Sequence, residues 1–431
     1  MNRLNKLFVV CVDALCDIDL DYAKTLPNFG RVLAEGSLAR HVKPVYPSFT
    51  YPCHVSIMTG VYPDRHGIPH NEMVEPGAAR PPWYRMRSMV KVPYLLDHAK
   101  ARGLTTCSLN WPLTAGADID LNMPMALPLY YEGDALPFYE GSATPELLDR
   151  YFRKHYWALS NQHASLDLFT MGMALDIIED YGQPDVMFVK LCDLDSARHA
   201  YGVDTPQAKL ALKWHDEQFG SLLDCLRRRG DPEHTNFVVL GDHGQSDVKR
   251  VMNFNRVLQA NGMLTLDANG ALADWDAYCH SVGLSAWIQL RDPDDAGLYD
   301  RVYDLLLSLK GDPDFAVDYV FTKEEAARDY HLTGPFDFVI ESARPVSFGY
   351  TPSDPLFVNA APGDYKTALA SHGGLPTRPR MTLFFASGPS VRQGVELDTA
   401  SLVDEAPTMA RMLGFDMPDV DGRVLTELLT V

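Results

Sequence analysis

The stretch KLFVVCVDAL, Lys6–Leu15, decides the fold class of this chain. Between Leu7 and Val12 every residue is apolar, and the run ends at Asp13. A short continuous run of this kind, rich in β-branched residues, is typical of a strand buried on both faces of a parallel sheet. We therefore predict a central parallel strand that ends at an acidic side chain.

Three later stretches repeat this design. DVMFVKLCDLD, residues 185–195, ends in aspartates, TNFVVLGDHG, residues 235–244, ends near an Asp-His pair, and MTLFFASGP, residues 381–389, is a further apolar run. Helical patterns alternate with these strands at residues 26–36, 92–103, 165–182, 205–230 and 401–415. The alternation predicts a doubly wound α/β sheet, in which ligands bind beyond the carboxyl ends of the strands.

The pattern changes between residues 262 and 365. Strand-like pieces surround one amphipathic helix at residues 295–311, and few residues here are suited to chemistry. We predict that 262–365 is an inserted α+β lid, and that 1–261 and 366–431 form one catalytic α/β core.

Composition and charge narrow the class of partner. The chain has 431 residues and a formal net charge of −19 at pH 7. So acidic a surface is unsuited to nucleic-acid polymers or anionic membranes, although a bound metal can still bring a small phosphate ester to it. No apolar stretch is long enough to span a bilayer, and Asp13 interrupts the apolar run near the N-terminus. Seven cysteines without paired spacing indicate reduced thiols, so the sequence predicts a cytoplasmic protein.

Acidic and histidine side chains after the predicted strands are candidate metal ligands. Asp13 follows the first strand, where an aspartate is also a common helix cap. Asp195 and His199 are four residues apart, which places both on one side of a helical turn. That spacing suits two ligands of one ion, and it equally suits a solvated pair.

Asp242 and His243 give a stronger signal, because the glycines on both sides allow a bent backbone that turns both side chains to one point. His372, in ASHGG, repeats the His-Gly pattern but is weak by itself. Together with Asp13, Asp195 and His199, these three residues provide carboxylates and imidazoles for two divalent ions. Zinc is the usual occupant of such mixed sites.

Thr50 lies in YPSFTYPCHVSIMTGVYPDRHGI, Tyr46–Ile68, directly before a helix-like run. A hydroxyl at this place can be an ordinary helix cap. It can also be a nucleophile, because a bound dication lowers the pKa of the hydroxyl and a pair of ions stabilises the attacking and leaving oxygens. The ligands by themselves leave the reaction open.

The ordered motifs resemble the alkaline phosphatase superfamily, and most closely its nucleotide pyrophosphatase/phosphodiesterase branch. The chain carries VDA, PSFTYPCHVSIMTGVYPDRHGI, DSARHAYG, GDHGQ, SHGG and DEAPTMARMLG in that order. The resemblance runs from about residue 6 to the C-terminus, and the lid is its least certain part. It implies a mixed, mostly parallel sheet flanked by helices, with two zinc ions at its active site.

The resemblance also implies roles at the matching positions. One zinc ion is expected to be held by Asp195, His199 and His372. The other is expected to be held by Asp13, Asp242, His243 and the hydroxyl of Thr50. Attack by Thr50 on phosphorus then gives a phosphothreonine intermediate, which water hydrolyses.

Neighbouring residues receive lesser roles. Tyr51 matches an aromatic position that stacks on the base in nucleotide-cleaving relatives, although a packing role is equally open. The family carries Asn where this chain has Cys53, and we expect this position to face a phosphoryl oxygen. A thiol is a weak hydrogen-bond donor, so stabilisation of that oxygen is expected to be poorer. His54, His66 and His70 match no ligand position and are expected to be structural.

The favoured function is therefore a two-zinc hydrolase that cleaves phosphodiester or pyrophosphate bonds in small nucleotide-type substrates. A phosphomonoesterase or phosphonate hydrolase with the same machinery is the alternative within the enzyme class. A non-catalytic metal-binding protein with this fold is the alternative outside it.

Overall fold

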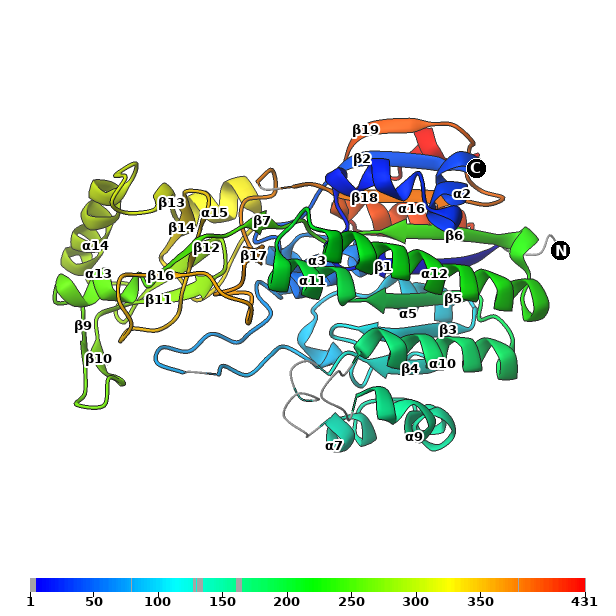
Figure 1. Cartoon of the computed structure of the whole chain (residues 1–431), viewed down its shortest axis with the longest axis horizontal. Helices are drawn as coiled ribbons and strands as arrows, with labels where there is room; N and C mark the ends of the chain where they lie inside the picture. The colour runs from blue at the N-terminus through cyan, green and yellow to red at the C-terminus, as the bar shows by residue number, and fades with distance from the viewer. Residues whose placement is uncertain are drawn as a thin grey trace.

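The computed structural model describes residues 5–78, 80–126, 129, 135–159, 165–378 and 380–430. An eight-stranded sheet in the order β19-β2-β18-β6-β1-β5-β3-β4 runs through the larger part of the molecule (Figure 1). Its strands are β1 (Lys6–Val12), β2 (Ser37–Lys43), β3 (Thr106–Trp111), β4 (Leu121–Pro124), β5 (Val186–Leu191), β6 (Thr235–Leu240), β18 (Thr382–Ser387) and β19 (Glu396–Ser401). β18 is antiparallel to both of its neighbours, and all other neighbours are parallel, which confirms the predicted mixed, mostly parallel sheet.

β1 is an interior strand of this sheet, as its sequence predicts. It pairs in parallel with β5 on one edge and with β6 on the other, so that Val9 lies between Phe188 and Val238. Its residues from Leu7 to Val12 are fully buried. Burial on both faces explains why the run shows no alternation of polar and apolar residues.

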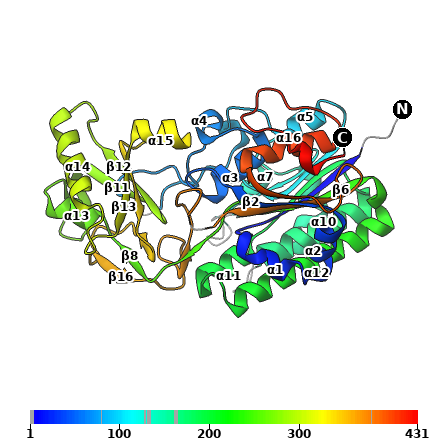
Figure 2. The same cartoon turned by 90° about the horizontal axis from the view of Figure 1, so that it is seen from above.

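Helices cover both faces of the sheet (Figure 2). One layer contains α2 (Pro27–Glu35), α10 (Leu166–Tyr181), α11 (Asp193–Tyr201) and α12 (Pro206–Arg229). The opposite layer contains α3 (Thr50–Thr59), α5 (Leu95–Lys100) and α16 (Glu405–Met412). Shorter helices are α1 (Leu20–Ala23), α4 (Pro63–His66), α7 (Ala135–Glu140), α8 (Pro145–Leu147) and α9 (Arg153–His155). None of the helices in the described ranges has the length and apolar character needed to cross a bilayer.

A second group of elements extends from one end of the large sheet, at the left of Figure 1. It contains a four-stranded antiparallel sheet in the order β11-β12-β14-β13, formed by Ala277–Val282, Ser285–Leu290, Phe338–Ser342 and Val317–Thr322. With it lie α13 (Asn255–Ala260), α14 (Ala296–Leu309) and α15 (Lys323–Tyr330), and the short strands β8 (Arg250–Met252), β9 (Leu264–Leu266), β10 (Leu272–Trp275), β15 (Val346–Phe348) and β16 (Phe357–Asn359). Its apolar cluster already includes Met252 and Phe254, ahead of residue 262.

Four strands of the large sheet were not predicted from the sequence. β19, with the sequence ELDTAS, is exposed or half-buried along its length, and β2 is only partly buried. β3, with the sequence TCSLNW, is buried but carries Thr, Ser and Asn side chains, and β4 is short. None of the four has the continuous apolar character by which the interior strands can be recognised.

Candidate metal centre

Three adjacent strands deliver candidate ligands to one edge of the sheet. Asp13 directly follows β1, the pair Asp242 and His243 follows β6, and α11, which follows β5, carries Asp195 and His199. These positions are the carboxyl ends of parallel strands, where α/β sheets bind ligands.

His372 reaches the same edge by a different route. It lies ten residues before β18, the antiparallel strand, whose start therefore lies where the parallel strands end. Just before it, the short strand β17 (Ala370–Ser371) pairs with β7 (Ser246–Asp247), which follows His243 in sequence. The reversed direction of β18 thus brings His372 to the other candidate ligands.

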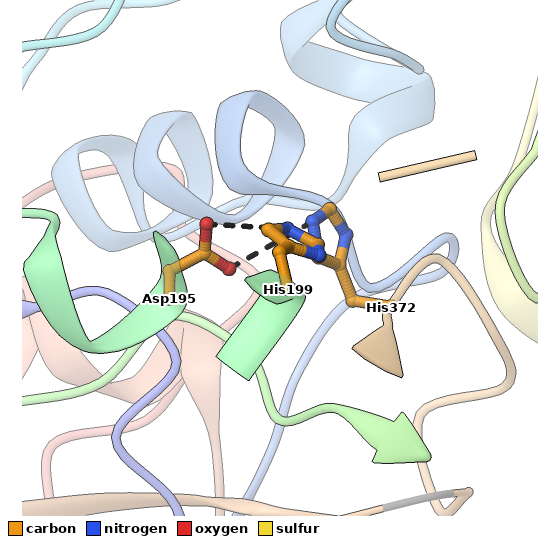
Figure 3. Close-up of side chains that lie close together, drawn as sticks. All are labelled: Asp195, His199 and His372. Atoms are coloured by element: carbon orange, nitrogen blue, oxygen red, sulfur yellow. Dashed lines mark ion pairs between the residues drawn. The ribbon is translucent and has the colours of Figure 1, made fainter. Parts of the chain in front are cut away.

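These six side chains form two clusters, and within each cluster the potential ligand atoms all lie within 4.8 Å of one another. The outer cluster consists of Asp195, His199 and His372, and its side chains face one another in Figure 3. Its Asp195 Oδ2 lies 3.3 Å from His199 Nε2, and Oδ1 lies 4.0 Å from His372 Nε2. The grouping matches the division that the resemblance implies.

The inner cluster consists of Asp13, Asp242 and His243, and all three are buried. His243 Nε2 lies 3.4 Å from Asp13 Oδ1 and 3.3 Å from Asp242 Oδ2. The two clusters adjoin, because the imidazole rings of His243 and His372 stack with their centroids 4.1 Å apart. Thr50 belongs to the same arrangement, since its Oγ1 lies 3.1 Å from His243 Nε2.

Unpartnered carboxylate oxygens show that the inner cluster fits a cation. Asp13 Oδ1 and Asp242 Oδ2 are buried and accept no hydrogen bond within the described ranges. Burial and the neighbouring Asp13 carboxylate raise the pKa of Asp242 well above its ordinary value. Two such oxygens beside a buried imidazole are costly in an apolar interior unless a positive charge neutralises them. Carboxylate and imidazole together are the donor set that zinc prefers.

Two of the three histidines are neutral in the metal-free protein. Burial lowers the pKa of His243 and, more strongly, that of His372, so both rings keep a lone pair at neutral pH. His199 Nδ1 lies 2.7 Å from the carbonyl oxygen of Ala370 and must donate to it, which leaves Nε2 as the nitrogen that faces Asp195 and that can bind an ion once it has lost its proton. Although burial opposes it, the Asp195 carboxylate raises the pKa of His199 to about 9 in the metal-free protein.

Among the described residues, the start of helix α3 leaves one backbone donor free, the N–H of Thr50. The helix begins at Thr50, and the N–H of Tyr51 donates to Asn71 Oδ1 at 2.9 Å. Pro52 has no N–H, and the N–H of Cys53 donates to the carbonyl of Phe49. In the described part of the chain, the Thr50 N–H has no acceptor, so it is the donor that the helix leaves for an anion.

The site opens into a cavity of about 500 Å³. Its walls combine the candidate ligands with aromatic and apolar side chains, and they are formed by Asp13, Thr50, Tyr51, Asn71, Trp83, Met125, Leu166, Cys192, Asp193, Asp195, Ser196, His199, Gly363, Asp364, Tyr365 and His372. Tyr51 lines this cavity, but its ring also packs edge-on against Trp83 at 5.3 Å, and only 1% of the residue is exposed. Both the stacking and the packing role of Tyr51 therefore remain predictions.

The structure does not place Cys53 at the cavity, where the resemblance implies that position 53 faces a phosphoryl oxygen. Cys53 is fully buried in the main apolar cluster and does not line the cavity. His54, His66 and His70 belong to neither cluster. His54 nevertheless borders the inner cluster, because its Nδ1 lies 2.7 Å from the carbonyl oxygen of Thr50 and 3.3 Å from Asp242 Oδ2.

Asn71 is an amide side chain at the cavity that the sequence analysis did not identify. It lines the cavity beside Thr50, and its Oδ1 is fixed by the Tyr51 N–H. Within the described ranges, its Nδ2 donates to no protein group, so the amide can donate to an atom in the cavity. The sequence offered no periodic or spacing signal for this residue.

Lys190 is the second residue that the sequence analysis missed. It lies inside the apolar run of β5, is fully buried, and places Nζ 2.5 Å from Asp13 Oδ2 and 3.0 Å from the sulfur of Cys192. Although burial alone would lower it, the Asp13 carboxylate raises the pKa of Lys190 above its ordinary value. A lysine inside an otherwise apolar strand was the available signal, because lysine is rarely buried without a partner.

A third acidic cluster, Asp167, Asp193 and His215, lies next to the cavity wall. Asp167 accepts hydrogen bonds from the N–H groups of Cys192 and Asp193, and His215 Nε2 lies 2.9 Å from its Oδ2. These protein groups saturate the Asp167 carboxylate. The cluster therefore serves to hold the start of α11 in position.

Comparison with known proteins identifies related sequences and folds. A sequence model of the type I phosphodiesterase / nucleotide pyrophosphatase family matches residues 7–373. The human ectonucleotide pyrophosphatase/phosphodiesterase family member 7 is 24% identical over 98% of this chain and 83% of its own length. The solved structure of murine ectonucleotide pyrophosphatase/phosphodiesterase 5 has the same fold, with a TM-score of 0.70, 20% identity, and coverage of 99% of this chain and 100% of that one. An inactive threonine-to-alanine form of that murine protein has been solved in complex with AMP, with a TM-score of 0.71 and 19% identity over 99% of this chain and 100% of that one.

Proposed function

Because the chain belongs to the type I phosphodiesterase / nucleotide pyrophosphatase family, we propose that its two clusters hold a pair of zinc ions for phosphoryl transfer from small nucleotide-type diesters or pyrophosphates. The family makes it a metal-dependent hydrolase. The observation that carries the proposal is the position of Thr50, whose Oγ1 lies 3.1 Å from His243 Nε2 where the two clusters adjoin.

The two ions, when bound, would lower the pKa of the Thr50 hydroxyl and neutralise charge on the phosphoryl group. Asp195, His199 and His372 would hold one ion, and Asp13, Asp242 and His243 the other. Thr50 Oγ1 then forms a bond to phosphorus as the bond from phosphorus to the leaving oxygen breaks. Water later cleaves the resulting phosphothreonine and restores the hydroxyl.

Groups around Thr50 orient the phosphoryl oxygens. Within the described ranges the Thr50 N–H and the Asn71 Nδ2 have no protein acceptor, and both residues line the cavity, so both donors are available to a phosphoryl group there. Donors fixed before the reaction stabilise charge that develops in the transition state without reorganisation. Asn71 therefore takes the donor role that the sequence analysis gave to position 53.

The cavity supports a small organic group on the substrate. Tyr51, Trp83, Met125 and Leu166 give it an apolar and aromatic wall, which suits a base or another flat group. No lysine or arginine is among the lining residues of the described part of the chain, so the walls offer no cationic clamp for extra phosphate charge. This composition favours a diester over a doubly charged monoester at the cavity wall.

The first experiment compares kcat/KM of the zinc-loaded protein for p-nitrophenyl thymidine 5′-monophosphate and for p-nitrophenyl phosphate. We expect a clear preference for the diester. Preference for the monoester would overturn the proposed substrate class. Turnover of neither ester by protein with both ions bound would instead favour a non-catalytic metal-binding protein.

We further propose a cytoplasmic location and a small-molecule partner. The seven cysteines are all buried and none forms a disulfide, which is compatible with a reducing compartment. The relatives carry names of ectoenzymes, so the location needs its own test. Fractionation of cells that express the natural chain should recover the protein with cytoplasmic markers, and recovery outside the cell would refute this proposal.

A further inference from the structure

The ammonium group of Lys190 lies directly behind the inner cluster. Its Nζ is 2.5 Å from Asp13 Oδ2, while Asp13 Oδ1 lies 3.4 Å from His243 Nε2 and has no hydrogen-bond partner in the described ranges. The two oxygens of this carboxylate therefore face different groups. Oδ2 forms an ion pair with Lys190, and Oδ1 is available to bind an ion.

This arrangement changes the charge of the ligand set. Asp13 and Asp242 carry two negative charges, and the ammonium of Lys190 cancels one of them. A dication bound by this set leaves a net positive charge beside Thr50, whereas without the lysine the charges would balance. Because the lysine is fully buried, little solvent screens this charge.

The lysine is also anchored in a way that keeps it at this position. Its backbone belongs to β5 and pairs with Cys11 of β1, and its carbonyl accepts a hydrogen bond from Asn110 Nδ2 at 3.2 Å. The sulfur of Cys192 lies 3.0 Å from Nζ on the cavity side. Nζ itself does not line the cavity, so its effect on substrate passes through Asp13 and through the electric field.

We propose that Lys190 is a built-in cation that sets the charge preference of the site and makes it bind doubly charged phosphoryl groups more tightly than its two carboxylates alone would allow. This proposal rests on the proposed function, because it concerns the same phosphoryl site. The doubly charged species are inorganic phosphate, phosphomonoesters and the phosphothreonine intermediate. Lys190 thus offsets the preference for diesters that the uncharged cavity wall creates.

The test compares Lys190→Gln and Lys190→Met with the natural chain. Gln removes the charge but keeps an N–H donor near Asp13, whereas Met removes both. In a Thr50→Ala background we expect both variants to bind inorganic phosphate at least about tenfold more weakly by calorimetry. Zinc affinity at the inner cluster should stay equal or increase, because a repelling charge is gone. With Thr50 intact, the ratio of kcat/KM for p-nitrophenyl phosphate over the diester should fall by about tenfold or more.

Lys6→Met is the matched control. Lys6 also links β1 to the start of β5, through an ion pair with Asp185 at 2.6 Å. This ion pair lies at the amino ends of the two strands, away from the candidate ligands. We expect this variant to lose some stability while its zinc affinity, phosphate affinity and substrate ratio stay unchanged. It therefore separates loss of a β1–β5 ion pair from loss of charge at the site.

Two results would overturn the proposal. If Lys190→Gln behaves like the natural chain and only Lys190→Met is impaired, the lysine acts as a hydrogen-bond support for Asp13. If zinc affinity and kcat/KM for both substrates fall equally in both variants, Lys190 has only a structural role. Should Lys190→Met fail to fold, Lys190→Gln alone decides. Failure of the proposed function has a different signature, since the natural chain would then turn over neither ester.

Discussion

Replacement of Asn71 tests whether the site stabilises the phosphoryl group through this amide. Asn71 is 2% exposed, its Oδ1 accepts the Tyr51 N–H at 2.9 Å, and its Nδ2 is available to the cavity. Loss of one preorganised donor to a developing oxyanion costs about 2.7–4 kcal/mol, or about a hundredfold to a thousandfold in rate. We therefore expect Asn71→Ala to lower kcat for the diester by that factor, with a smaller change in KM.

Asn71→Ala also removes the acceptor for the Tyr51 N–H, which should cost about 1 kcal/mol of folding stability. Asn71→Asp separates the two effects, because it keeps an oxygen for that N–H while it replaces the donor by a negative charge that repels the phosphoryl group. We expect it to fold as well as the natural chain and to be at least as impaired in kcat. The assay is steady-state hydrolysis of p-nitrophenyl thymidine 5′-monophosphate, with zinc content measured for each variant.

Cys53→Ala is the comparison that can refute this reasoning. Cys53 lies in the core and away from the cavity, so its loss should reduce stability but change kcat less than about threefold. If Cys53→Ala slows the reaction as much as Asn71→Ala does, position 53 rather than Asn71 serves the phosphoryl group. If Asn71→Asp retains full activity, no donor at this position matters.

Three other predictions follow from the geometry. Thr50→Ala should keep both zinc ions, measured by elemental analysis, and lose turnover by more than about a thousandfold, whereas loss of zinc together with activity would contradict a separate nucleophile. In the metal-free protein, pairing with Asp195 raises the pKa of His199 from 6.5 to about 9, so its stabilising contribution is complete below about pH 6.5 and is lost as the pH rises through about 9. The melting temperature of the metal-free protein should fall across that range in the natural chain and not in His199→Gln, and equal slopes would refute the pairing. Asp167→Ala should lower the melting temperature without changing the zinc stoichiometry, because the Asp167 carboxylate binds protein groups, and loss of one ion per chain would show a third metal site.

The sequence predicted the interior of the sheet and the candidate ligands for a shared physical reason. β1, β5 and β6 are buried on both faces, so their apolar runs are continuous, and the residues directly after them are held at one edge of the sheet. Asp13 and the Asp242-His243 pair follow from this rule alone. His372 does not, because it depends on the reversed direction of β18, which no local pattern reveals.

Asn71 and Lys190 show where sequence reasoning stops. Asn71 lies in a segment without helical or strand periodicity, and its importance comes from a contact with Tyr51, twenty residues earlier. Lys190 is visible in the sequence as a charge in an apolar strand, but its partner Asp13 directly follows the neighbouring strand β1 and is 177 residues away. Only the pairing of β1 with β5 brings the two together.

The segment between His243 and His372 is tied together at its two ends, which helps the site to keep its geometry. This segment starts and ends at the carboxyl ends of the parallel strands. Movement of this segment would therefore displace a candidate ligand at each of its ends. The short pairing of β7 with β17, in which Ser246 lies opposite Ser371, joins these two ends directly beside the ligands. The carbonyl of Ala370 accepts from His199, and the Leu369 N–H donates to the His199 carbonyl, which ties the same point to α11. The segment beyond this junction shapes the cavity through residues such as Tyr365, and it also supports a ligand directly, because the Leu284 N–H donates to the His372 carbonyl at 2.9 Å and the Tyr365 ring stacks on that of His372 at 5.7 Å.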